Sequence, residues 1–148
     1  MHSFGVTQND GQEPTSALIN VQGLLYGTTS SGGSGNQGTV FSITTEGSEN
    51  IVYSFAASGR NGIGPAAALK NVRGVFYSTT PSGGANDAGT VFKVTKNGKE
   101  TVLHSFVKGD GVNPVAGVIA VDGTLYGTAF GSNAYKSKQY GNVFSLAP

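Results

Sequence analysis

Short sequence elements recur three times along this chain at a spacing of about 51 residues, as Ser3-Phe4, Ser54-Phe55 and Ser105-Phe106 show. Further matched positions follow in the same order in each copy: Pro14, Pro65 and Pro114; Tyr26, Tyr77 and Tyr126; Val40-Phe41, Val91-Phe92 and Val143-Phe144. A fixed period of this length is typical of repeat architectures. Because a repeat unit rarely buries its own apolar face, the period predicts that each unit packs on its neighbours.

Each repeat is predicted to form four short β-strands. In the first copy these are residues 17–21, 24–29, 39–44 and 49–55, all rich in Val, Ile, Thr, Tyr and Phe. Glycine, Asn and Asp turn residues separate them, and no helical period is sustained. We therefore expect an all-β chain that forms a single repeat domain over residues 1–148. Its repeats cover about 5–55, 56–106 and 107–148.

The connections between the predicted strands are of two kinds. Tight turns with Gly23 or Gly47 follow the first and third strands of a repeat, whereas long loops follow the second and fourth. In an up-and-down antiparallel sheet, alternate connections lie at the same end. The long loops should therefore share one face, and binding residues concentrate on such loops.

The phase of the repeat predicts how the sheets are completed. Residues 1–4 (MHSF) match the fourth-strand segments that end at Phe55 and Phe106, and residues 142–146 match a third strand. The third repeat then lacks a fourth strand, while residues 1–4 supply a spare one. Rings of β-sheets use such a strand exchange to hide their edges.

The strings LYGTTSSGGSGNQGTVFSIT, FYSTTPSGGANDAGTVFKVT and LYGTAFG…YGNVFSL resemble the GloVer-type tandem repeat, described from Gloeobacter and Verrucomicrobia proteins. The resemblance covers nearly the whole chain. It implies a β-propeller fold and a secreted or surface-anchored bacterial protein, and it implies no defined activity. The third copy departs from the pattern, because its long loop reads FGSNAYKSKQYG.

Three four-stranded blades are too few for a propeller, which usually has about four to eight. A C2 homodimer would give six, and each N-terminal strand would complete the third blade of the other subunit. We therefore expect half of a six-bladed ring in each chain. A monomeric β-trefoil, which also has three four-stranded units, is the alternative.

Composition limits the partners of the chain. It has 9 Lys and Arg against 8 Asp and Glu, a net charge of +1, and no Cys. This balance gives no electrostatic reason to expect nucleic acid or an anionic membrane, and disulfides and thiolate chemistry are absent. No apolar run has the length of a membrane span, and no signal-peptide core is recognisable, so we expect a soluble chain. Its compartment is left open.

Candidate ligand-binding residues lie in the predicted long loops. The stretch that breaks the repeat offers rings and cations for stacking and polar contacts, and the glycine loops offer amides and a carboxylate. The candidates are Phe130, Tyr135, Lys136, Lys138 and Tyr140, then Asn36, Asn86 and Asp87, and the turn residues Asp10 and Asp110.

Catalytic and metal chemistry is not indicated. His2 and His104 align with Tyr53, so this position is interpreted as a site for a ring in a strand. The Asp10 and Asp110 loops supply too few oxygens for calcium and are interpreted as turns. The glycine loops lack the Lys of a phosphate-binding loop and are interpreted as flexible connections. No catalytic residue, metal or cofactor is assigned.

Three functions remain open from the sequence. The first is a non-catalytic binding module that uses the long-loop face and central funnel of a ring for a small molecule, glycan or peptide. The second is a hydrolase or lyase acting on sugars or lactones, by analogy with other propellers. The third is a purely structural or interaction protein.

Overall fold

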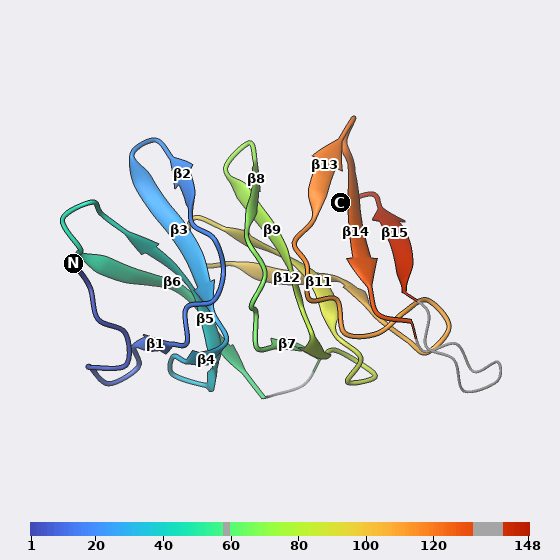
Figure 1. The fold of residues 1–148 in the computed structure, drawn as a ribbon, viewed down its shortest axis with the longest axis horizontal. Coiled ribbons are helices and arrows are strands. Elements are labelled where there is room, and N and C mark those ends of the chain that lie inside the picture. Colours follow the sequence, from blue (N-terminus) through green and yellow to red (C-terminus); the bar gives the residue numbers. More distant parts are fainter. Residues whose placement is uncertain (58–59, 132–140) are drawn as a thin grey trace.

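The computed structural model describes residues 1–57, 60–131 and 141–148, and these residues form strands and no helix. Three antiparallel sheets follow one another along the chain (Figure 1). The first sheet has the order β2-β3-β5-β6, the second β8-β9-β11-β12 and the third β13-β14-β15. The all-β prediction is confirmed. No sheet of the described residues closes into the barrel that a β-trefoil requires.

The strand bounds follow the repeat. The first sheet contains β2 (Ile19–Val21), β3 (Leu24–Thr29), β5 (Asn36–Ile43) and β6 (Glu49–Ala56). The second contains β8 (Lys70–Val72), β9 (Val75–Thr80), β11 (Thr90–Thr95) and β12 (Glu100–Ser105). The third contains β13 (Ile119–Val121), β14 (Thr124–Ala129) and β15 (Asn142–Leu146). Because the third sheet has no fourth strand in the described chain, β15 is an edge strand.

The tight turns form because their residues accept left-handed backbone. At the β2–β3 turn, Gln22 has φ of 57° and Gly23 has φ of 83°, which is the two-residue hairpin geometry that matches strand twist. The β8–β9 and β13–β14 turns repeat it. These three hairpin tips lie at the top of Figure 1, and the long connections with β1 and β7 lie at the bottom.

The glycine loops of the first two repeats contain short paired strands. β4 (Ser31–Gly32) pairs with β1 (Gly11–Gln12), and β10 (Ser82–Gly83) pairs with β7 (Gly62–Ile63). In the third repeat, the bridge between Val112 and Phe130 takes the corresponding place. Each long loop is therefore tied to the segment that enters its own sheet.

The hydrophobic core lies between consecutive sheets. One buried cluster joins the first sheet to the second through Tyr26, Val40, Phe55, Leu69, Phe76, Phe92 and Val94. The other joins the second sheet to the third through Tyr77, Ala88, Val91, Phe106, Val118, Leu125 and Ala129. The prediction that the units pack on their neighbours is correct for both contacts.

Residues 1–4, which match a fourth strand, form no strand in the single chain. Phe4 nevertheless packs on Phe41 of the first sheet with ring centroids 4.9 Å apart. Phe55 packs on Phe92 and Phe106 on Phe144 in the same way, each at 5.1 Å. The segment therefore has the side-chain contact of a fourth strand but lacks the neighbouring strand that would pair with its backbone.

Candidate functional site

The two sheet–sheet contacts share one repeated hydrogen bond. Thr28 in β3 donates its hydroxyl to the carbonyl of Ala67, 3.2 Å away, at the entry to the second sheet. Thr79 in β9 donates in the same way to the carbonyl of Ala116, 2.9 Å away, at the entry to the third. Both threonines are fully buried. The same threonine-to-carbonyl hydrogen bond thus joins the first sheet to the second and the second sheet to the third.

In the third sheet the matching residues are exposed among the described residues. Val143 in β15 is 74% exposed, whereas its counterparts Val40 and Val91 are fully buried. Tyr126 is 39% exposed, and the side chain of Thr128 also faces solvent. Ile119 and Val121 extend this exposed apolar face. In the first and second sheets, the next sheet along the chain covers the corresponding face.

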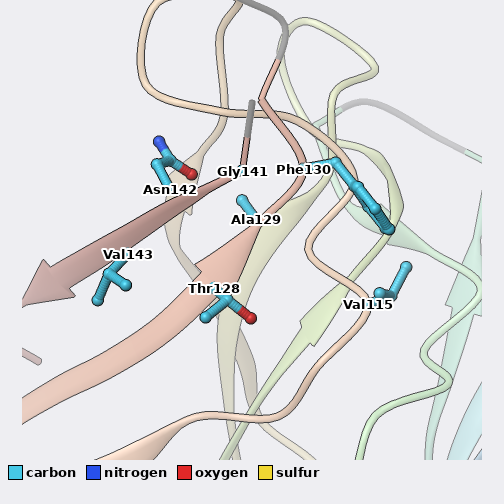
Figure 2. A pocket seen from close by; sticks show the side chains of 7 residues that line it. All are labelled: Val115, Thr128, Ala129, Phe130, Gly141, Asn142 and Val143. Carbon is cyan, nitrogen blue, oxygen red and sulfur yellow. The ribbon is translucent and has the colours of Figure 1, made fainter. Parts of the chain in front are cut away.

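A hollow of about 530 Å³ lies on this exposed face (Figure 2). Phe130 and Val115 line one side of it, and Asn142 and Val143 line the other. Its remaining lining residues are Thr128, Ala129 and Gly141. We call it the third-sheet hollow.

Prolines fill the matching places in the first two repeats. A Cβ built on Gly38 would lie 2.7 Å from Cδ of Pro65, and one built on Gly89 would lie 2.6 Å from Cδ of Pro114. Glycine is required there by this close approach and by φ values of 96° and 97°. Gly141 is the counterpart in the third-sheet hollow and has no proline near it in the described chain.

The first sheet has an exposed face whose residues match those that pack on a preceding sheet in the other two repeats. Leu18 is 49% exposed, although its counterparts Leu69 and Val118 are 4% and 5% exposed. Pro14 is exposed, whereas Pro65 and Pro114 are buried. The third sheet thus has an uncovered apolar face. The first sheet carries the residues whose counterparts cover the matching face in the other repeats.

A second feature recurs at the long-loop end of the sheets, where a ring from the fourth-strand position meets a side chain from the following loop. Nε2 of His104 lies 2.7 Å from Oδ2 of Asp110. Nδ2 of Asn61 donates to the hydroxyl of Tyr53 at 3.4 Å. Nε2 of His2 lies 3.5 Å from Oδ1 of Asp10.

The two aspartates also accept hydrogen bonds from the backbone. The N–H of Val107 donates to Oδ1 of Asp110, and that of Val6 donates to Oδ2 of Asp10. Each ring packs edge-on against the Phe two residues later in the chain, at 4.7 to 4.9 Å. These contacts agree with the interpretation of the His position as a ring site and of the loops as turns.

Glu49 lies beside the first of these pairs, and sequence reasoning missed it. Its Oε2 lies 3.4 Å from Nε2 of His2. Burial, together with the adjacent Asp10 carboxylate, raises the pKa of Glu49 to about 7. Burial alone would raise the pKa of Asp10, but its contact with Glu49 and backbone N–H groups hold that pKa below its usual value. The recurrence of Glu at 49 and 100 is the sequence signal that could have revealed this residue.

The sequence-predicted ligand residues do not gather into one site. Asn36 is exposed and pairs with Ala56. Oδ1 of Asp87 accepts from the N–H of Gly83, and Asn86 donates to the carbonyl of Phe106. Asp10 is buried. These four side chains or their backbones thus take part in the loop structure.

The stretch that breaks the repeat is only partly described. Phe130 is 58% exposed and lines the third-sheet hollow. Tyr135, Lys136, Lys138 and Tyr140 lie outside the described residues. Asp110 remains part of the His104 pair described above.

Comparison with known proteins gives one match. The family model of the Gloeobacter/Verrucomicrobia repeat matches residues 1–148. No curated protein and no solved structure matches the chain. The described residues contain no helix long and apolar enough to cross a membrane.

Proposed function

The chain belongs to the Gloeobacter/Verrucomicrobia repeat family, and we propose that it is a non-catalytic binding module, two copies of which together form a six-bladed β-propeller. In this assembly the third sheet of each copy packs on the first sheet of the other. The observation that best supports this assembly is that Val143 is exposed, whereas its counterparts Val40 and Val91 are fully buried.

The contact expected between copies follows the two contacts inside the chain. Thr128 would donate to the carbonyl of Ser16 in the second copy, as Thr28 does to Ala67 and Thr79 to Ala116. Pro14 of the second copy would fill the third-sheet hollow next to Gly141. Burial of an exposed Val or Leu side chain stabilises by roughly 1.5–3 kcal/mol, and the assembly buries such side chains at two equivalent contacts.

The edge of the third sheet supports the same assembly. β15 is an unpaired edge strand in the described chain, and such edges invite pairing with another strand. Residues 1–4 of the second copy match a fourth strand and would lie beside it. Phe4 would then keep its contact with Phe41 of its own chain.

Substitution of Val143 tests the assembly. Because this side chain is exposed in the single chain, Val143→Asp should leave the β-sheet circular dichroism unchanged and convert a dimer into a monomer in light scattering. Thr101→Asp is the control, since Thr101 is an exposed strand residue on β12. A Val143→Asp protein that stays dimeric would refute the proposed contact.

The ring would present its long-loop face to a small molecule, glycan or peptide. Phe130, whose ring is exposed in the single chain, lies at that end beside the proposed contact between the copies, and stacking and polar contacts can combine there. In a glycan and peptide array, Phe130→Ala should reduce binding at least tenfold, and Arg73→Ala at the tight-turn end should leave it unchanged. Because Phe130 also lines the third-sheet hollow, light scattering must show that the Phe130→Ala protein is still a dimer. Arrays without any bound ligand would exclude these two ligand classes.

A further inference from the structure

Three potential metal ligands converge where the N-terminal segment meets the first sheet. His2 comes from that segment, Asp10 from the loop before β1, and Glu49 is the first residue of β6. One ligand atom from each lies within 4.8 Å of the others. Nε2 of His2 lies 3.5 Å from Oδ1 of Asp10 and 3.4 Å from Oε2 of Glu49.

These separations fit a tetrahedral cation. Zinc binds His nitrogen and carboxylate oxygen at roughly 2.0–2.2 Å, so neighbouring ligand atoms around it are about 3.3–3.5 Å apart. A calcium ion would require about six to eight oxygens, and this site supplies a nitrogen and two carboxylates. The ligand set is therefore that of a divalent transition metal.

Burial provides an independent reason to expect a ligand. The side chain of Asp10 is 1% exposed, and its Oδ1 has no hydrogen-bond partner among the described residues. Nε2 of His2 and Oε1 of Glu49 are likewise buried and without a hydrogen-bond partner. A buried polar atom without a partner destabilises the folded state, and a charged one does so more strongly. A cation bound between these side chains would give Oδ1 of Asp10 and Nε2 of His2 a partner, and it would offset the repulsion between the Asp10 and Glu49 carboxylates.

The second oxygen of Asp10 is already fixed. It accepts the backbone N–H of Val6 at 3.2 Å, which orients Oδ1 toward His2. Hydrogen bonds of this kind commonly orient the ligands of metal sites.

The repeat itself provides a comparison. At the entry to the second sheet the same three positions carry Tyr53 of β6, Asn61 of the following loop and Glu100 of β12, a set with one carboxylate and no imidazole. His104 and Asp110 form a two-residue pair in the part of the chain that the structure describes. The residues around the first sheet thus differ from those around the second by the chemistry of a metal site.

We propose that His2, Asp10 and Glu49 bind one Zn²⁺-class divalent cation per chain, which fixes residues 1–4 to the first sheet. A fourth position is left for water or an external ligand. The proposal does not depend on the ring, because all three ligands belong to one chain.

Zinc titration by calorimetry tests the site, with the chain carrying a C-terminal tag that contains no histidine. One Zn²⁺ per chain should bind, and Co²⁺ should give the visible absorption of a tetrahedral centre. His2→Tyr, Asp10→Asn and Glu49→Gln should each weaken Zn²⁺ binding at least tenfold. Bound Zn²⁺ should also raise the melting temperature of the parent chain, and these variants should lose that rise.

Matched substitutions provide the controls. His2→Tyr introduces the residue that stands at the matching position 53, so the sheet content of this variant should be preserved. His104→Tyr and Glu100→Gln should bind Zn²⁺ as the parent does. Val143→Asp should also bind it, which separates this site from the proposed assembly. Stoichiometric binding that survives His2→Tyr, or that is lost with His104→Tyr, would overturn the proposal, as would a parent chain that binds no Zn²⁺.

Discussion

The ring of Phe4 packs against the ring of Phe41 with centroids 4.9 Å apart and an interplanar angle of 65°. The pairs Phe55–Phe92 and Phe106–Phe144 repeat this arrangement at 5.1 Å. In those two pairs the first Phe lies at the end of one sheet and the second lies in the next. Phe4 therefore meets the first sheet as though it belonged to a preceding one, which is the relationship that the proposed dimer would provide.

Truncation of these rings should separate an internal contact from an unfinished one. Phe55 is fully buried, and Phe55→Ala should lower the free energy of unfolding by about 3–5 kcal/mol. Phe4 is only partly buried, so Phe4→Ala should cost less than half as much in the monomer. Urea unfolding of both variants in a Val143→Asp background measures the difference. Equal costs would mean that the N-terminal segment is already as well packed as β6.

Removal of the threonine hydroxyl that bonds to the next sheet should have different effects in the second and the third sheet. Thr79→Val leaves the carbonyl of Ala116 without its donor, and should lower the free energy of unfolding by about 1–3 kcal/mol. Thr128→Val should change monomer stability by less than about 0.5 kcal/mol, because the side chain is exposed. It should instead raise the dissociation constant of the dimer. Sedimentation equilibrium tests this, and an unchanged constant would count against the contact of Thr128 with Ser16.

Mixing two defective chains tests the direction of the contact. Leu18→Asp damages the first-sheet face and Val143→Asp the third-sheet face, so each variant alone should be monomeric. A mixture retains one intact pair of faces and should form a heterodimer in native mass spectrometry. A contact between identical faces would give no heterodimer, and this outcome would exclude the head-to-tail arrangement.

Stability should depend on the ionisation of Glu100. Burial raises the pKa of Glu100 to about 6, compared with 4.5 for an unperturbed Glu. The folded state therefore holds this proton more tightly than the unfolded state does. The resulting stabilisation is complete below the unfolded pKa and is lost as the pH rises through about 6.

Glu100→Gln should remove this dependence and raise stability at about pH 8 by up to about 2 kcal/mol. The nearby Tyr53, whose pKa burial raises and Glu100 raises further, stays neutral over this range. Urea unfolding at several pH values in the Val143→Asp background provides the measurement. Glu46→Gln, at an exposed turn, is the control. Parallel pH curves for the parent and Glu100→Gln would contradict the expectation.

The strands could be predicted where local sequence decides them. The sequence predicts strands over residues 24–29 and 49–55, which form β3 and most of β6, because β-branched and aromatic runs lie there next to glycine turns. The strand predicted for residues 17–21 begins only at Ile19. The residues just before Ile19 correspond to residues of the other repeats that pack on a neighbouring sheet. Their conformation therefore depends on tertiary contacts and not on local sequence alone.

The remaining features depend on residues far apart in the sequence. β1 and β4 contain Gly, Gln and Ser, which have no strand signal, and they form through pairing with each other. Glu49 lies far along the chain from His2 and Asp10, so no local spacing places it beside them. The exposure of Val143 is visible only when its burial is compared with that of Val40 and Val91.

The mass of the parent chain in solution tests the central claim most directly. Light scattering at micromolar concentration should give twice the 15.0 kDa of one chain, and the value should fall to that of one chain for Val143→Asp. A parent chain that remains a stable 15.0 kDa monomer would contradict the account.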